Sequence, residues 1–375
     1  MKKLIFRNLL KDVSNFFIVA AISISIIIWV IQAVNYLDFV AEDGHSFKVY
    51  FMYTLLSLPK IVSRILPFIF FISVFYIIIK YEENNQLIIF WLNGIKKITF
   101  LNVLIKYSLL FLLLQTLFTA FIVPQTQDLA RSFIRSSTID LFPSLIQERK
   151  FIDTVSNLTI YVDEKTKNGL LKNIFLKDQF NNNKSQTIYA REGRIVNKDN
   201  KNYLVLKNGQ IINKDNKNIS TFSFKTTQFN LSKYGTKTTV FPKIQEQNSY
   251  TLSRCLYFYF NNKKNLYVNK YLNCDSDSVK HIMREFFRRI FLPFYMPLIA
   301  LIVGSIILTS KNNVNYNRSK LKIFILTIFI IIVSEISVRY FAQSNLSSIL
   351  LILMPIIFFF TTYLILNSKL KYISE

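Results

Sequence analysis

Residues 16–35 read FFIVAAISISIIIWVIQAVN, a run of 20 positions without a charged side chain. A helix needs about 20 apolar residues to cross the hydrocarbon core of a bilayer, so this run is long enough. Five further segments meet the same criterion, at about 61–79, 98–123, 290–309, 321–340 and 347–366. With 51% apolar and 18% charged residues, the whole chain has the composition of an α-helical polytopic membrane protein.

The first run resembles a cleaved signal peptide in one respect, because four basic residues precede it: Lys2, Lys3, Arg7 and Lys11. Its apolar part is too long, however, because it continues without a charged residue to Asn35. We therefore expect this segment to be retained as the first membrane helix.

The short flanks of the six segments predict the orientation, because cytoplasmic flanks are enriched in Lys and Arg. The flanks on the side of the N-terminus carry Lys2, Lys3, Arg7, Lys11, Lys80, Lys96, Lys97, Lys311, Arg318, Lys320, Lys322, Lys369 and Lys371. The opposite short flanks, 36–60 and 341–346, carry only Lys48 and Lys60. Both termini are therefore predicted on the cytoplasmic side, with the region 125–287 on the outside of the membrane.

Residues 151–231 alternate polar and apolar side chains as half-buried strands do. The expected strands are 157–164, 171–178, 186–195, 203–212 and 220–229. Asn208-Gly209 is a typical hairpin signal, because both residues tolerate positive φ. Five or more short strands with regular turns favour a sandwich or jelly-roll core at about 150–240. The flanking segments 125–150 and 249–287 are expected to be mostly helical connectors.

The predicted organisation therefore has three parts. Residues 1–124 hold membrane helices 1–3, residues 125–287 hold an inserted periplasmic all-β, jelly-roll-like domain, and residues 288–375 hold membrane helices 4–6.

The sequence contains few residues that could carry out catalysis. No G-x-x-x-x-G-K-[ST] loop occurs, so the chain is not expected to bind ATP in that way. Its two histidines, His45 and His281, offer neither a catalytic set nor metal-ligand spacing. No cofactor or metal is expected. The net charge of +24 is spread over helix ends and the polar middle, unlike the clustered charge of nucleic-acid binders.

The two cysteines, Cys255 and Cys274, are too few for a disulfide framework. Free buried thiols are the simpler expectation, and a bridge is the alternative if the region is periplasmic.

A short apolar segment lies on the predicted cytoplasmic side, at about 82–95. Glu82 and Glu83 suit a helix N-terminus, and Gly94 is well placed to end the helix. Three large side chains share one face at i, i+3 and i+4: Leu87, Phe90 and Trp91. Two interpretations remain open: an interfacial helix resting on the membrane, or a projection that fits a groove of a partner.

Several basic residues run against the orientation bias, at the outer ends of spans: Lys60, Arg64, Arg288, Arg289 and Arg339. The simpler interpretation is that they extend toward lipid headgroups, with Glu335 and Arg339 as an intrahelical pair. The functional interpretation is a set of cations around a cavity mouth that captures phosphates, for which guanidinium groups are well suited.

Three local patterns, together with the order of spans and strands, make the chain resemble the permeases of lipopolysaccharide export, the LptF/LptG family. Residues 85–95, NQLIIFWLNGI, are similar to its acidic-Leu-x-x-x-x-x-x-Gly coupling helix, although Gln86 stands where an acidic residue is usual. Arg288-Arg289 precede Pro293, and Pro59 and Pro67 share the second span.

The resemblance implies a non-catalytic subunit that extracts lipopolysaccharide from the inner membrane. It implies as partners a second permease (LptG-like), a cytoplasmic ATPase dimer (LptB-like), a single-span periplasmic jelly-roll protein (LptC-like) and a periplasmic bridge protein (LptA-like). The run 147–151 leading into 158–162 resembles the F-type permease; the G-type is the alternative. The implied ATPase-coupling residues are Gln86, Leu87, Phe90, Trp91, Asn93 and Gly94. Phe90 and Trp91 are expected to anchor in the ATPase groove.

Two rival functions come from other classes. A secondary transporter built from two three-span repeats would break helices near the midplane, and only Pro297 and Gly304 come near that role. A role as a membrane assembly scaffold would explain the architecture, but it would give no function to the helical segment at 82–95.

Overall fold

The computed structural model describes residues 2–37, 47–137, 146–155, 157–166, 169–181, 184–198, 201–215, 218–231, 243–261 and 274–374. The chain forms two compact units. The helical unit comprises Met1–Val30, Ser57–Gln127 and Lys243–Glu375, and the sheet unit comprises Ile31–Leu56 and Asp128–Pro242. The boundaries expected near residues 124 and 287 stay a prediction.

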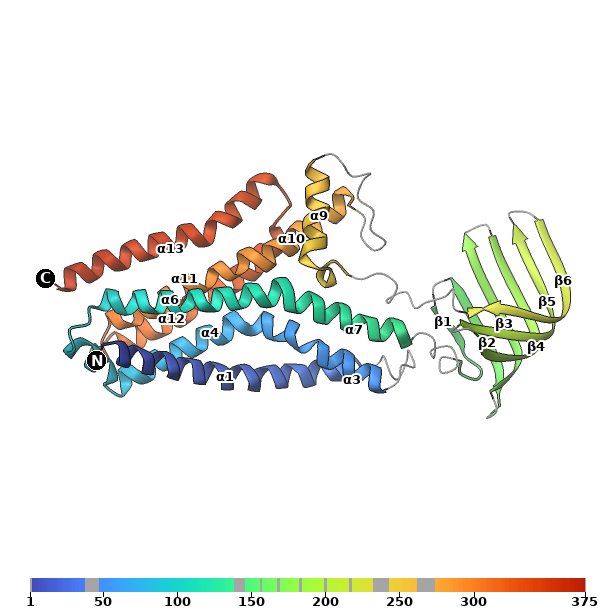
Figure 1. The fold of residues 1–375 in the computed structure, drawn as a ribbon, viewed down its shortest axis with the longest axis horizontal. Coiled ribbons are helices and arrows are strands. Elements are labelled where there is room, and N and C mark those ends of the chain that lie inside the picture. The colour runs from blue at the N-terminus through green and yellow to red at the C-terminus, as the bar shows by residue number, and fades with distance from the viewer. Residues whose placement is uncertain are drawn as a thin grey trace. The chain divides into compact units, whose positions relative to one another are not determined.

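Among the described residues, six helices are long and apolar enough to cross a membrane, as the sequence predicts. They are Lys2–Asn35, Phe47–Glu83, Lys97–Ile134, Ser276–Leu308, Tyr316–Tyr340 and Leu346–Leu370. Their elements (Figure 1) are α1 (Lys2–Asn35), α3 (Phe47–Leu56), α4 (Leu58–Glu83), α6 (Lys97–Leu117), η1 (Phe118–Ile122), α7 (Val123–Ser137), α10 (Ser276–Phe286), η5 (Phe287–Phe291), η6 (Leu292–Phe294), α11 (Tyr295–Gly304), η7 (Ser305–Leu308), α12 (Tyr316–Tyr340) and α13 (Asn345–Ser374).

The core of the helical unit forms around α11, in which every residue is buried. α11 packs on α4, α6, α12 and α13, and its side chains join those of Phe70 and Leu101 in one apolar cluster. A methyl group on Gly304 would lie 2.5 Å from Cδ2 of Leu101. The absence of a side chain at Gly304 therefore lets α11 and α6 approach closely.

The β-domain predicted from the sequence is present as one antiparallel sheet. Its described strands are β1 (Phe151–Val155), β2 (Leu158–Lys165), β3 (Leu170–Asn181), β4 (Lys184–Lys198), β5 (Lys201–Asp215) and β6 (Asn218–Asn230). They pair in sequence order, so a single up-and-down sheet replaces the two separate sheets of a sandwich. The long strands curve strongly (Figure 1), and one apolar cluster fills the side that they bury.

The predicted hairpin turn at Asn208-Gly209 is wrong, because both residues lie inside β5. Pairing with β4 continues on both sides of them, with Leu206 opposite Gly193 and Gly209 opposite Ala190. Instead, Asn208 has a positive φ (53°) at a kink within β5. Asn173 in β3 has a φ of 50°, and Ile174 and Leu171 on either side of it are both buried. β3 therefore changes its buried side at Asn173, and the kinks in β3 and β5, which lie on either side of β4, accompany the curvature of the sheet (Figure 1).

The segment after the sheet forms η3 (Ile244–Glu246) and α9 (Ser249–Phe260) before α10 begins. Cys255 on α9 is joined by a disulfide to Cys274, and their Cα atoms lie 5.8 Å apart. The expectation of free thiols is therefore wrong. Both cysteines are buried in a small cluster with Leu252 and Ile282, so the bridge fixes α9 beside the start of α10.

Candidate functional site

A cavity with basic walls lies where the fourth and fifth membrane helices meet the segment after the sheet. Its volume is about 610 Å³. The lining residues are Lys243, Ile244, Gln245, His281, Arg284, Glu285, Arg288, Val338, Arg339 and Gln343. Four of them are Lys or Arg, and Glu285 is the one carboxylate of the set. We call this cavity the basic cavity.

One face of the helix that runs from α10 into η5 supplies the wall of the basic cavity. His281, Arg284 and Arg288 follow each other at i, i+3 and i+7, which places them on one side of a helix. The Nε of Arg284 donates a hydrogen bond to the carbonyl oxygen of Phe341, at 2.9 Å. This bond fixes Arg284 against the end of α12.

Two of the predicted phosphate-binding residues line the basic cavity together. Arg288 lies 3.4 Å from Glu285, and about a third of its side chain is exposed (32%). Arg339 is exposed at the end of α12. Among the described residues no ion pair joins Arg339 to Glu335, which is also exposed, so the expected intrahelical pair is not formed.

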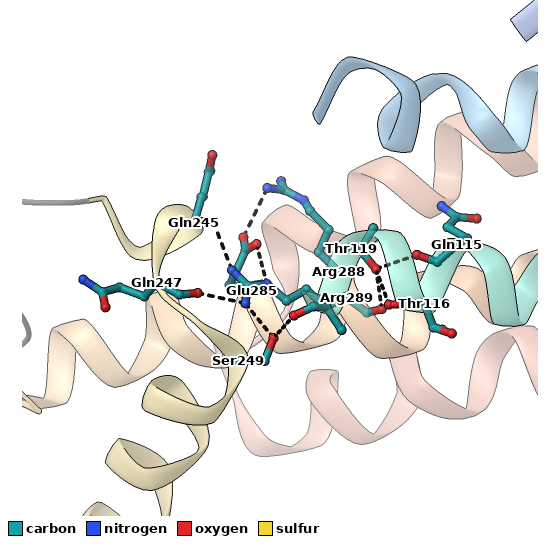
Figure 2. Close-up of polar contacts among 10 residues, drawn as sticks. Gln115, Thr116, Thr119, Gln245, Gln247, Ser249, Glu285, Arg288 and Arg289 are labelled. Carbon is teal, nitrogen blue, oxygen red and sulfur yellow. Dashed lines mark hydrogen bonds and ion pairs between the residues drawn. The ribbon is translucent and has the colours of Figure 1, made fainter. Parts of the chain in front are cut away.

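Arg289 has a different role from its neighbour, because it is buried (1% exposed). Figure 2 shows its guanidinium among the acceptors supplied by Glu285, Gln247 and Ser249. Its Nε donates to Glu285 at 3.0 Å, and its two terminal nitrogens donate to the carbonyl oxygens of Gln245 and Gln247, both at 3.0 Å, and to Ser249 at 2.8 Å. With these partners Arg289 cannot also hold a phosphate, so the prediction for this residue is corrected.

Two further bonds complete the attachment around Arg289 (Figure 2). Thr119 in η1 donates its hydroxyl to the carbonyl oxygen of Arg289 at 2.9 Å. Ser249 donates to the carbonyl oxygen of Ala120 at 2.6 Å. The third span, the fourth span and the segment that follows the sheet in sequence are therefore joined at one buried ion pair, which we call the Arg289 junction.

Lys60 and Arg64 are not brought into the basic cavity. Lys60 is half-buried and its Nζ lies 3.4 Å from Oε1 of Gln127, while Arg64 is exposed on α4. Conversely, sequence reasoning missed Lys243, His281 and Arg284. The spacing of His281, Arg284 and Arg288 in HIMREFFRR is a helical stripe that predicts a shared face for these three. Nothing in the sequence places Lys243 beside them.

The predicted coupling segment forms the short helix α5 (Gln86–Leu92), which begins after Asn85 (φ 59°) and ends at Gly94 (φ 67°). Its apolar face is turned inward, because Leu87 and Phe90 are each 1% exposed. The ring of Phe90 packs edge-on against Phe6 and Phe100, with centroids 5.3 Å apart in each case.

Trp91 is also partly enclosed, and the Nζ of Lys97 lies 5.8 Å from its ring centre. The large apolar side chains that α5 exposes are Ile88 (47%), Ile89 (49%) and Leu92 (81%), and the predicted coupling residue Gln86 is exposed as well. In this structure Phe90 cannot therefore serve as the partner-facing anchor expected from the sequence. The three exposed apolar residues, Ile88, Ile89 and Leu92, form what we call the outer face of α5.

Comparison with known proteins supports the resemblance stated from the sequence. The family described as "Lipopolysaccharide export system permease LptF/LptG" matches residues 7–369 of the chain. A curated relative, the uncharacterized protein RP871 of Rickettsia prowazekii (strain Madrid E), is 23% identical over 189 residues. That match covers 50% of this chain and 52% of the relative, so the chain spans about half the length of this relative.

Proposed function

Because the chain belongs to the LptF/LptG family of lipopolysaccharide export permeases, we propose that it extracts lipopolysaccharide from the inner membrane and passes it to a periplasmic jelly-roll bridge. It would do so as one membrane subunit of an ABC transporter, in the F-type role, with ATP hydrolysed by a separate partner. The assignment to the F-type rests on the resemblance of residues 147–151 and 158–162.

The observation that carries this proposal is the basic cavity. Lipopolysaccharide presents phosphate groups at the membrane surface, and guanidinium groups bind phosphate oxygens in pairs. Arg284, Arg288 and Arg339 converge on one cavity of about 610 Å³, and Glu285 is engaged by Arg289 behind them. The lining therefore keeps an excess of positive charge for an anionic headgroup.

The Arg289 junction gives the cavity its shape in this proposal. It holds residues 245–249 against α10, and that segment supplies Gln245 and its neighbours Lys243 and Ile244 to the cavity wall. Arg289 is thus a positioning residue, and Arg284, Arg288, Arg339 and Lys243 are the groups that would contact phosphate.

The disulfide supports the proposed orientation. Disulfides persist in the periplasm and are rare in the cytoplasm. Cys255 and Cys274 lie in sequence between η3 and α10, two of the elements that supply residues to the basic cavity. The bridge therefore favours a periplasmic position for that end of the helical unit. Both termini would then be cytoplasmic, as the distribution of Lys and Arg also predicts.

The outer face of α5 is the proposed contact with the cytoplasmic ATPase. It has three exposed apolar side chains, and in the proposed orientation they lie on the cytoplasmic side, where the ATPase would bind. Because an exposed apolar patch is unfavourable in water, this surface is expected to be covered by a partner. The other proposed partners are the second, LptG-like permease and the LptC-like and LptA-like jelly-roll proteins.

Photo-crosslinking tests the role of the basic cavity. A photoreactive residue replaces Gln343, which lines the cavity and is exposed, and crosslinked lipopolysaccharide is quantified after purification. Arg288→Ala combined with Arg339→Ala is expected to lower the yield at least about tenfold, because each lost charged hydrogen bond costs about 1.5 kcal/mol or more.

The matched control removes two exposed cations from the opposite end of α12, with Arg318→Ala and Lys322→Ala. It is expected to crosslink as the unmodified chain does. Full crosslinking in the cavity variant would move phosphate capture elsewhere, to Lys60 and Arg64. If the unmodified chain gives no crosslink to lipopolysaccharide, lipopolysaccharide is not its cargo, and a role as a membrane assembly scaffold is favoured.

A further inference from the structure

A second charged cavity lies at the other end of the helical unit, between the start of α1 and the facing part of α6. Its volume is about 830 Å³. The lining residues are Lys3, Leu4, Phe6, Arg7, Leu10, Lys11, Ser14 and Val103. We call it the α1 groove.

The charge of the α1 groove is of one sign. Lys3, Arg7 and Lys11 follow at intervals of four residues, so they form one stripe along the helix, and none of the lining residues is acidic. The ion pairs among the described residues do not include any of the three.

The nearest carboxylate in sequence, that of Asp12, is not among the lining residues of the α1 groove. Asp12 accepts a hydrogen bond from the hydroxyl of Tyr81 at 2.5 Å, on α4. In addition, the first turn of α1 carries no acidic residue, and the N-terminus of a helix bears a partial positive charge. The groove thus attracts an anion.

The remaining wall of the α1 groove is apolar and leads into the membrane. Leu4, Leu10 and Val103 line it, and Ser14 at its inner end is bonded to the hydroxyl of Tyr107 at 2.7 Å. From Lys3 to Ser14 the helix advances about 16 Å, at 1.5 Å per residue. Because no charged residue occurs between residues 13 and 37, the groove spans the transition from headgroups to hydrocarbon.

We propose that the α1 groove binds one anionic phospholipid of the leaflet at the N-terminal end of α1, with its phosphate on Lys3, Arg7 and Lys11 and an acyl chain along Leu10 and Val103. A soluble anion would leave the apolar wall exposed. In the proposed orientation α1 begins on the cytoplasmic side, beside α5 (Lys2 donates to the carbonyl oxygen of Gly94 at 3.3 Å), so lipopolysaccharide of the opposite leaflet would not reach the groove. The proposal is independent of the cargo.

Native mass spectrometry of the full chain, released from nanodiscs of equal parts phosphatidylglycerol and phosphatidylethanolamine, tests this site. The unmodified chain is expected to retain phosphatidylglycerol over phosphatidylethanolamine by at least about fivefold, since a basic residue near an anionic lipid surface contributes roughly that factor. The variant Lys3→Gln, Arg7→Gln, Lys11→Gln is expected to retain both lipids equally.

A matched control removes three exposed lysines at the ends of other spans on the same side: Lys80→Gln, Lys322→Gln and Lys369→Gln. It is expected to keep the preference. Equal loss in this control would show a general effect of charge and overturn the site, as would an unchanged preference in the α1 variant.

A variant that fills the groove and a competition with inorganic phosphate test the site independently of the triple variant. Val103→Trp fills the groove from α6 and leaves every charge in place, so it is expected to abolish the retained phosphatidylglycerol even if the triple variant fails to insert. Retention by Val103→Trp would overturn the proposal. Displacement of the lipid by inorganic phosphate would also overturn it, because the apolar wall would then contribute nothing.

Discussion

Arg288 and Arg289 are neighbours in sequence with opposite environments. Arg288 lines the basic cavity and a third of its side chain is exposed, whereas the guanidinium of Arg289 is buried and bonded to Glu285 and to residues 245–249. The pair Arg288-Arg289 in the sequence suggests two equivalent phosphate ligands. Adjacent positions on a helix point about 100° apart, however, so one neighbour can line a cavity while the other enters the core.

Replacing Arg288 by Lys keeps the charge and removes the planar fork. If Arg288 binds phosphate through two nitrogens, Arg288→Lys is expected to lower the crosslinking yield at the basic cavity about tenfold, nearly as much as Arg288→Ala. Crosslinking equal to that of the unmodified chain would show that charge alone matters at this position.

Arg289→Met is expected to destabilise the helical unit rather than to weaken cargo binding alone. It leaves Glu285 buried without its principal partner, and breaking a buried ion pair in this way typically costs about 3–5 kcal/mol. The readout is the midpoint of thermal unfolding of the purified protein in detergent. Adding Glu285→Gln removes the orphaned charge and is expected to restore part of the loss. An unchanged midpoint in Arg289→Met would contradict the structural role.

Among the elements, α5 shows how an apolar pattern can be assigned to the wrong surface. Leu87, Phe90 and Trp91 share a face, as the sequence indicates, but this face packs on Phe6 and Phe100. The helix and its termination by Gly94 can be predicted from the sequence. It does not reveal that the aromatic side is already covered by α1 and α6, because those contacts come from residues far away in the chain.

The outer face of α5 leads to a separate prediction. Leu92→Ser is expected to weaken ATPase recruitment about thirtyfold, the equivalent of a hot spot of about 2 kcal/mol, while the chain inserts and unfolds normally. Leu87→Ser, the buried counterpart, is expected to lower the unfolding midpoint instead. Co-purification with the ATPase measures recruitment. Unaltered recruitment by Leu92→Ser would leave α5 as an interfacial helix.

The disulfide yields a prediction for the segment between η3 and α10. Closing a loop with a sequence separation of 19 residues stabilises a fold by about 3 kcal/mol, so Cys255→Ser is expected to lower the unfolding midpoint. In intact cells, a maleimide reagent is expected to label Cys255 and Cys274 only after reduction. Labelling without a reductant would contradict the bridge and remove its support for the orientation.

The strands were the most predictable elements of the sheet unit, because alternation fixes which residues share a face. The expected strands at 157–164, 171–178, 186–195, 203–212 and 220–229 correspond to β2 to β6. β1 was missed as a separate strand, and Asn208-Gly209 was interpreted as a turn. Positive φ is needed at both a hairpin and a strand kink, so local residue types cannot separate the two.

At the scale of the whole molecule, six apolar runs around a strand-rich insertion predict the architecture, and the order of these elements together with the local motifs resembles the family that matches the chain. Apolar length and period-2 alternation are local properties, which is why they could be read from the sequence. The basic cavity could not be predicted in full, because Lys243 and Arg339 meet there across nearly a hundred residues of chain. The Arg289 junction is hidden for the same reason.

The proposed function of this chain is to move lipopolysaccharide with energy from a partner. The most direct test reconstitutes it, together with its co-purifying permease and ATPase, in proteoliposomes that contain lipopolysaccharide, and measures ATP-dependent transfer to a soluble jelly-roll acceptor. Transfer is expected to need both ATP and this chain and to fall with Arg288→Ala and Arg339→Ala, and the chain alone is expected to hydrolyse no ATP. Active ATP hydrolysis by the complete assembly without any release of lipopolysaccharide would contradict the proposed function.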